Sequence, residues 1–300
     1  MKNLLIATTA LVATAGMAAA EITLSGGARF GVIYSDDGTD TDTEVTNRFT
    51  LNVDGTAETD SGAEFFARVR VRGGNTGTAG LGNSGVSAPR VGVTMGGLTV
   101  ATGNINGALE STPNLYAGNV GLTGLGWGSL PTNFSGAGTF AWDAFSSAGA
   151  GRNGVEVIYS ANGFGAHLSR SGATGAVRTA MNVSYSFGDW KVALATQTSD
   201  TALEDTTVLT AAGKIGNIAV GFAHADNEGD FDATRINAGF EVGAGTNVTT
   251  YYTSGEVANS YGLGFTHSLG GATLAGGIAK LDVNNGADVT VADFGVRFNF

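Results

Sequence analysis

The sequence predicts an all-β protein: a 16-stranded antiparallel transmembrane β-barrel with one long loop folded into the lumen. Three observations carry this prediction. Apolar and polar residues alternate along most of the chain, short Gly-rich turns alternate with longer polar connections, and no apolar run after residue 20 is long enough for a membrane helix. The 300 residues include 49 Gly, 3 Pro and no Cys, which excludes a disulfide framework, a thiolate metal site and a cysteine nucleophile.

The charge balance of the chain is acidic, with 26 Asp and Glu against 15 Lys and Arg and a formal net charge of −11. Nucleic-acid binding relies on clustered basic residues, so this balance argues against it. The histidines His167, His224 and His267 are scattered along the sequence, which argues against an all-histidine metal site. A hydrophobic content of 42% argues against disorder.

Residues 1–20 predict a cleaved secretory signal peptide. Lys2 supplies a positive start, an apolar stretch covers residues 4–15, and three alanines at 18–20 form a small-residue cleavage site. The alternative, a short N-terminal membrane anchor, needs a longer apolar run. We therefore expect an exported protein whose mature chain, 21–300, is the barrel.

The strands are predicted from side chains that alternate with a period of two. In the first strand, for example, Ile22 and Leu24 alternate with Thr23 and Ser25. The expected strands are 21–34, 46–57, 61–72, 88–95, 98–104, 154–161, 164–173, 177–187, 190–198, 206–215, 218–225, 233–242, 246–255, 258–268, 271–281 and 288–300. An even number of strands lets the first strand pair with the last.

The connections between these strands are of two kinds. Short ones, such as Gly96 with Gly97 and Gly188 with Asp189, supply the positive-φ residues that tight hairpins need. Longer polar ones, such as 36–44 and 73–87, alternate with them. This order places the tight turns at one end of the barrel and the loops at the other.

The number of apolar strips decides which face of the barrel points outward. A small soluble barrel fills its interior with apolar side chains, but so many strips exceed what one interior can hold. The polar face must therefore line a wide aqueous lumen, and the apolar face must meet lipid, where a closed barrel satisfies every backbone amide. Aromatic residues beside the short turns fit an interfacial girdle; they are Phe164, Phe187, Trp190, Phe298 and Phe300.

Residues 105–153 break the alternation. This segment of 49 residues is longer than an ordinary connection, and such loops are usually functional or disordered. It contains many large hydrophobic residues, including Leu109, Leu115, Trp127 and Phe134, so it should pack on another part of the protein. We expect it to fold into the lumen and form a constriction; the alternatives are a lid or a contact surface for another subunit.

Basic residues gather on the inward face of the first four strands. They are Arg29, Arg48, Arg68, Arg70 and Arg90, with Arg72 near the rim. Guanidinium groups are always protonated, so these residues create a permanent field inside the barrel. We expect them to form the wall of the constriction, opposed by Glu110 and Asp143 of the long loop. The alternative is that the arginines are merely solvated or pair locally with Asp54 and Glu64.

Three segments carry a resemblance to a known family: residues 21–32 (EITLSGGARFGV), 55–62 (GTAETDSG) and 291–300 (VADFGVRFNF). In these the chain resembles the general diffusion porins of Gram-negative bacteria, specifically the alphaproteobacterial, Rhodobacter-type porins. The resemblance implies a homotrimer of 16-stranded barrels in the outer-membrane lipids, with a third loop folded inside as an eyelet. Phe298 and Phe300 are similar to the family's barrel-assembly signal.

The resemblance also implies a passive, water-filled channel for ions and small hydrophilic solutes, which needs no cofactor. The family commonly holds several carboxylates and bound calcium in its inner loop, whereas this loop contains two acids, which argues against calcium. Two other classes of function stay open. One is a membrane-barrel lipase or protease that uses His167 or His224, and the other is a soluble secreted adhesin or β-sandwich.

Overall fold

The computed structural model describes residues 20–76, 84–125, 128–133, 140–146, 153–172, 176–229, 231–284 and 286–300. Residues 1–19 of the expected signal peptide, together with Trp127 and Phe134, lie outside these ranges. Among the described residues, no helix has the length and apolar character needed to cross a membrane.

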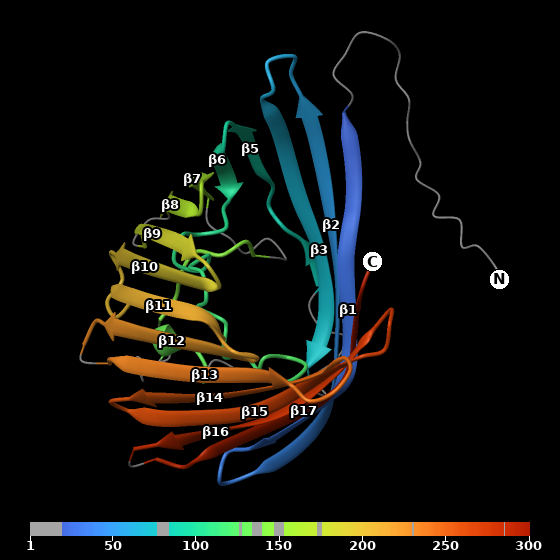
Figure 1. Ribbon diagram of the computed structural model, residues 1–300, viewed down its shortest axis with the longest axis vertical. Helices are drawn as coiled ribbons and strands as arrows, with labels where there is room; N and C mark the ends of the chain where they lie inside the picture. The colour runs from blue at the N-terminus through green and yellow to red at the C-terminus, as the bar shows by residue number, and fades with distance from the viewer. Residues whose placement is uncertain are drawn as a thin grey trace, which may run out of the picture.

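The described residues form a single closed antiparallel sheet, in which β1 pairs with both β2 and β17 (Figure 1). Its strands are β1 (Glu21–Asp36), β2 (Thr41–Glu58), β3 (Glu64–Thr76), β4 (Ser84–Val86), β5 (Arg90–Met95), β6 (Leu98–Asn104), β7 (Asn153–Ala161), β8 (Phe164–Ser171), β9 (Arg178–Phe187), β10 (Trp190–Ser199), β11 (Thr206–Ile215), β12 (Ile218–Asn227), β13 (Ala233–Glu241), β14 (Thr246–Gly255), β15 (Ala258–Ser268), β16 (Thr273–Val283) and β17 (Val289–Asn299). A short 3-10 helix, η1, covers Pro131–Asn133.

The strands β4 and β5 share one position in the barrel. Both pair with β3, β4 through Val71–Gly73 and β5 through Glu64–Arg68, and Pro89 lies between them. Proline has no backbone N–H to donate, which accounts for the interruption. The barrel therefore has sixteen strand positions, and the predicted fold class is confirmed.

The main difference from the predicted strands is at the start of β2. We expected a loop over 36–44, but β2 begins at Thr41 and stays paired with β1, with Thr41 opposite Asp36. This stretch carries polar residues on both faces, so it has no apolar alternation. Pairing depends on backbone hydrogen bonds, which can continue where side chains give no such signal.

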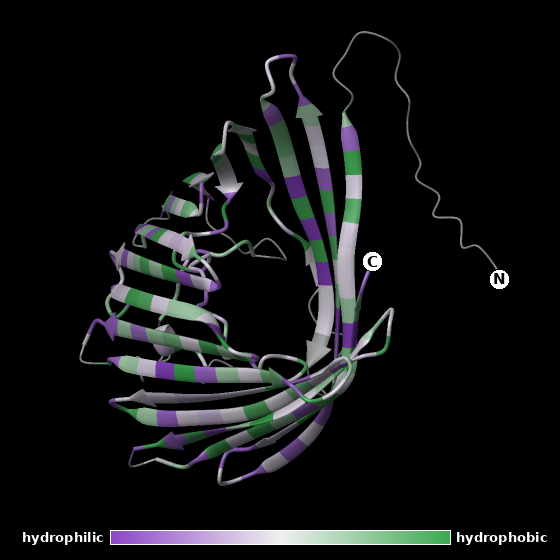
Figure 2. Cartoon of the chain, viewed as in Figure 1, coloured by the Kyte–Doolittle hydropathy of each residue, from purple (hydrophilic) through white to green (hydrophobic). Residues whose placement is uncertain are grey.

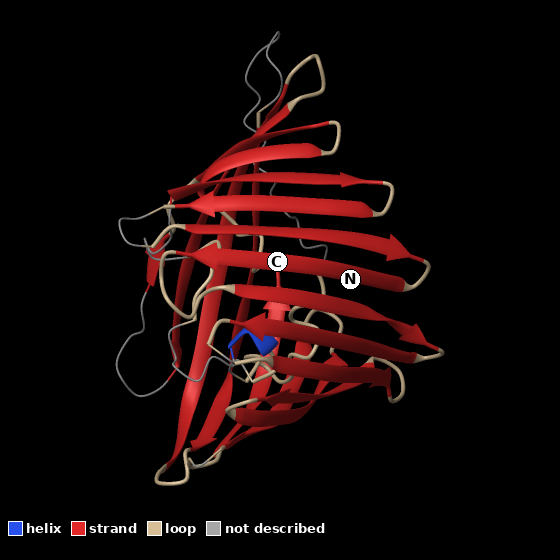
Figure 3. Cartoon of the chain, turned by 90° about the vertical axis from the view of Figure 1, so that its left-hand side faces the viewer, coloured by secondary structure: helices blue, strands red, loops and turns tan. Residues whose placement is uncertain are grey.

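The outer face of the barrel is apolar, and the inner face is mainly polar or small. On β1, Phe30 and Val32 are 57% and 45% exposed, and Figure 2 shows how hydrophobic and hydrophilic residues alternate along the strands. Exposed apolar side chains in such a belt are typical of a lipid-facing barrel. The short turns line up along one edge, as Figure 3 shows, and contain positive-φ glycines such as Gly97 and Gly163.

Candidate functional site in the barrel interior

The described part of residues 105–146 packs against the inner face of the wall. Its buried Leu109, Leu115 and Leu130 form a cluster with small residues on β9 to β11, such as Ala180 and Ala195. Ala195 lies on the face opposite to the exposed Leu194, so this cluster is on the polar side of the sheet. These described hydrophobic residues thus pack against inward-facing residues of the wall, and Figure 1 shows the segment running inside the ring of strands.

Inward glycines let the segment approach the wall closely at Gly121. Gly264 on β15 and Gly277 on β16 are paired, and a Cβ added to either would lie 2.8 to 2.9 Å from backbone atoms of Gly121. Gly31 and Gly295, paired between β1 and β17, make the same kind of room, since a Cβ on either would lie 2.7 Å from Leu122 Cδ2. These four wall glycines form what we call the glycine seat.

The carboxylate of Asp293 on β17 holds the same turn. It is 6% exposed and accepts hydrogen bonds from the backbone N–H of Leu122 at 2.8 Å and of Thr123 at 2.6 Å, and from the Thr123 hydroxyl at 2.7 Å. On the neighbouring strand, Arg29 donates to the carbonyl oxygen of Leu122 at 3.3 Å. Because its three charge-assisted hydrogen bonds are all shorter than the one from Arg29, Asp293 is the main polar attachment of this turn.

A second attachment is Arg235 on β13, which is fully buried. Its guanidinium donates to the carbonyl oxygens of Asn114 at 2.8 Å and Ser129 at 3.0 Å, and also to that of Leu115. A guanidinium carries five donors in a fixed plane, so one side chain can fix three backbone positions of the segment.

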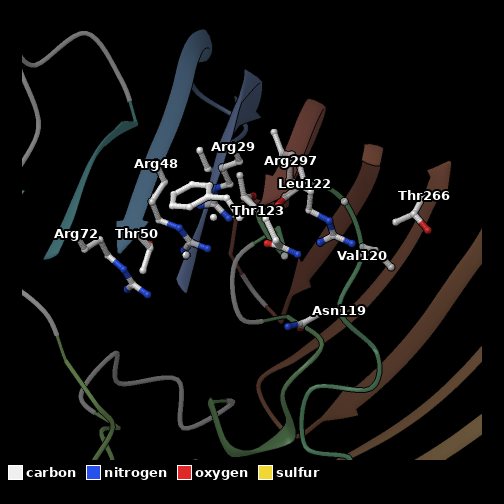
Figure 4. A pocket seen from close by; sticks show the side chains of 18 of the residues that line it. Arg29, Arg48, Thr50, Arg72, Asn119, Val120, Leu122, Thr123, Thr266 and Arg297 are labelled. Carbon is white, nitrogen blue, oxygen red and sulfur yellow. Dashed lines mark hydrogen bonds between the residues drawn. The ribbon is translucent and has the colours of Figure 1, made fainter. Parts of the chain in front are cut away.

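Four arginines line a recess beside the glycine seat. Arg297 on β17, Arg29 on β1 and Arg48 on β2 stand opposite one another in register, and Arg72 on β3 stands opposite Thr50. The recess has a volume of about 680 Å³, and all four side chains extend toward it in Figure 4. Among the described residues, no acidic side chain lines the recess. Within the described ranges, none of these four arginines has a carboxylate oxygen within 4.0 Å.

The other predicted wall arginines have local partners. Arg68 forms two hydrogen bonds with Asp54, at 2.5 and 3.1 Å, as the alternative of local pairing anticipated. Arg90 pairs with the buried Glu156 at 2.5 Å. Arg70 lies with its guanidinium carbon 4.8 Å from the centre of the Phe145 ring and donates to the Phe145 carbonyl.

Two of the five predicted arginines, Arg29 and Arg48, thus line the recess. Arg72, which we expect near the rim, lines it as well. Arg297 was missed, because it lies at the other end of the chain and reaches the site only through the pairing of β17 with β1. The signal was present, since a closed barrel joins its first and last strands and Arg297 lies on the polar face of the last one.

The two acids of the long segment lie elsewhere than expected. Glu110 accepts hydrogen bonds from the Tyr116 hydroxyl and the Trp142 indole N–H, groups that need an acceptor when they are buried. Burial and the Glu110 carboxylate raise the pKa of Tyr116. Asp143 pairs with Arg178 at 3.5 Å. The structure therefore corrects the expectation that Glu110 and Asp143 oppose the predicted arginines of the first strands, because Asp143 pairs instead with Arg178 of β9.

Sequence reasoning also missed the buried charge clusters that flank the segment. Arg178 on β9 forms two hydrogen bonds of 2.6 Å with Glu204, in the connection between β10 and β11. His167 on β8 is the candidate base for an enzyme. Its Nε2 atom lies 2.9 Å from Oε2 of the buried Glu156 on β7. These groups are already paired with one another, so they hold the wall and the segment together.

The residues of the long segment do not fit a calcium site. Calcium takes six to eight oxygen ligands, several of them carboxylates. Both acids of the segment are engaged by other side chains, and the described residues contain no group of three or more acidic or histidine side chains that could hold a metal ion. The expectation of a channel without a cofactor stays a prediction.

Comparison with known proteins gives one consistent family. The Gram-negative porin family matches residues 7–286. A curated porin from Fuscovulum blasticum is 30% identical over 303 residues, which cover 93% of this chain and 100% of the relative. A solved mutant of Rh. blastica porin matches with a TM-score of 0.80 at 25% identity, over 93% of this chain and 100% of the other. A structure described under asymmetric conductivity of engineered proteins matches with a TM-score of 0.81 at 26% identity and the same coverage.

Proposed function

The chain belongs to the Gram-negative porin family, and from this premise we propose that it is a passive outer-membrane channel for ions and small hydrophilic solutes, narrowed by residues 105–153 and by arginines of the wall. Porins are channel proteins, so an enzymatic function is set aside. Solutes would cross through water in the lumen, and no energy source or cofactor is required.

One observation carries the finer part of this proposal: the described part of the long segment packs on the inner face, close to arginines that have no carboxylate oxygen of the described residues within 4.0 Å. A segment in that position reduces the cross-section available to a solute. Uncompensated guanidinium groups in a narrow, low-dielectric frame bias which ions pass. The segment therefore supports selection by size, and the arginines support selection by charge.

We further propose that residues 1–20 are a cleaved signal peptide and that the mature barrel assembles as a homotrimer, as its family membership implies. The C-terminal aromatics suit an assembly signal. Phe300 stacks on Phe49 with ring centres 5.7 Å apart, and its backbone exchanges hydrogen bonds of 2.8 and 3.1 Å with Gly26. An assembly factor that binds Phe298 and Phe300 in the unfolded chain would hold β17, the last strand. Pairing of β17 with β1 then closes the barrel.

Liposome swelling in neutral sugars of increasing size tests the role of the segment. A variant with residues 105–153 shortened should admit larger sugars than the native protein. The matched control shortens the connection between β16 and β17, where Asp288 pairs with Lys280 of β16, and should leave the cut-off unchanged. Heat-modifiable migration on gels checks that both variants fold. A folded 105–153 variant with the native cut-off would contradict the proposed constriction.

A further inference from the structure

We propose that the recess formed by Arg29, Arg48, Arg72 and Arg297 is a binding site for multivalent oxyanions of the phosphate class, which occupy it on their way through the lumen. This inference rests on the proposed channel function and adds a ligand to it. We call these four residues the arginine recess.

Three like charges stand side by side in the arginine recess. Arg297, Arg29 and Arg48 occupy directly opposite positions on three adjacent strands, and like charges placed opposite one another destabilise a sheet. Elsewhere on the same wall, two arginines form ion pairs with carboxylates: Arg68 with Asp54, and Arg90 with Glu156. The arginine recess lacks such a partner among the described residues, so a dissolved anion is the group that would relieve the repulsion.

The nearest acid does not neutralise the recess. Asp293 lies on β17 close to Arg29, but its oxygens already accept three hydrogen bonds from Leu122 and Thr123, and it does not line the recess. The long segment therefore covers the Asp293 carboxylate. Among the described residues, the charged groups that line the recess are all guanidinium groups.

The donors and the size of the recess suit an oxyanion of the phosphate class. A guanidinium presents paired N–H donors that match two oxygens of a phosphate, and the Nε atoms of Arg29 and Arg72 are buried without a hydrogen-bond partner in the described structure. Thr50, Asn119 and Thr266 add neutral polar groups around the same space (Figure 4). The volume of about 680 Å³ falls within the range of small-molecule sites.

The recess suits a multivalent oxyanion better than a halide. A chloride ion has one charge and no paired oxygens, so it forms no bidentate contact with a guanidinium and balances only one of the four charges. An oxyanion with two or more charges can bridge strands, for example between Arg297 and Arg48. Because the recess faces the inner side of the wall, away from the lipid-exposed Phe30 and Val32, the ligand is a dissolved solute and not a lipid headgroup.

Single-channel recording with pyrophosphate tests the site. Added to a potassium chloride bath at constant ionic strength, pyrophosphate should reduce the current through the native protein in a saturable way, and inorganic phosphate should act at higher concentration. The test variant is R48Q with R297Q, because neither side chain forms a hydrogen bond within the described residues, so the loop attachments stay intact. We expect its half-blocking concentration to rise by at least about tenfold, since two charge-assisted contacts are lost.

The matched control is K191Q with K214Q, which removes the same charge from the inner faces of β10 and β11. It should change the half-blocking concentration by less than about twofold, because charges outside the contact region are screened by salt. Equal block of the test variant and the native protein would overturn the proposal, as would conducting native channels that pyrophosphate does not affect.

A native protein that forms no conducting channels would be a failure of the proposed function instead. The site is then measured directly, by titration calorimetry of pyrophosphate into the folded protein in detergent. Saturable heat in the native protein that is lost in R48Q with R297Q supports the site. No saturable heat overturns it.

Discussion

The carboxylate of Asp293 gives the most direct test of how the long segment is held against the wall. In the D293N variant, one side-chain oxygen remains, and an NH₂ group replaces the other. An NH₂ group in the place of Oδ2 can accept neither from the Thr123 N–H nor from the Thr123 hydroxyl, so both hydrogen bonds to the charged carboxylate are lost. Hydrogen bonds to a charged group contribute roughly 1.5–3 kcal/mol each, so the loss of two at the lower figure is about 3 kcal/mol.

This loss should appear as local opening of the turn at Leu122 and Thr123. Since 1.4 kcal/mol is a factor of ten, the opening equilibrium should rise about 100-fold. Amide hydrogen exchange in detergent micelles measures it, because the exchange rate of a protected amide follows its opening equilibrium. The Leu122 and Thr123 amides should exchange faster by about this factor, while strand amides of β9 to β12 keep their native rates.

The control is D288N, which removes an exposed carboxylate that pairs with Lys280 at 2.8 Å and forms no hydrogen bond or ion pair with the described residues of the segment. It should leave the Leu122 and Thr123 amides at their native rates. Exchange in D293N within about threefold of the native rate would refute the attachment role of Asp293, since that corresponds to less than about 0.7 kcal/mol.

Three further substitutions test other contacts of the wall. R235M removes the buried guanidinium that binds three carbonyl groups of the segment. Limited proteolysis should then cut residues 105–133 faster than in the native protein. Equal cleavage would contradict the role of Arg235 in attaching the segment. G277V adds atoms where a Cβ alone would lie 2.9 Å from Gly121, so the turn should be displaced and the sugar cut-off in liposome swelling should change; an unchanged cut-off would argue against the glycine seat. E156Q breaks the buried pair with Arg90 and His167 and should lower the free energy of unfolding in urea by about 3–5 kcal/mol, and a loss below about 1 kcal/mol would show that the cluster is not structural.

Much of the fold is predictable from the sequence because a lipid-facing barrel imposes a period of two on every strand. The bounds of β6, β11, β14 and β15 agree with the predicted 98–104, 206–215, 246–255 and 258–268. The signal fails where side chains on both faces are polar, as at the start of β2, and where Pro89 interrupts the strand position shared by β4 and β5.

The interior site is less predictable, because it depends on contacts between residues far apart in the sequence. The arginines of β1 and β2 are visible as inward positions, but their grouping with Arg297 requires the register of β1 against β17. Likewise, Glu110 and Asp143 are the acids of the segment, yet their partners Trp142 and Arg178 follow only from how the segment packs. Nothing in the local sequence distinguishes the four glycines of the glycine seat from the other glycines of the chain, which has 49 in total.

Single-channel conductance of the refolded native protein in a planar lipid bilayer tests the central claim most directly. The account predicts large, stable conductance steps that close in thirds, as expected for a trimer of water-filled barrels. The absence of steps from a membrane-inserted, heat-modifiable barrel would contradict it, because a lumen closed by the long segment could not carry solutes by diffusion.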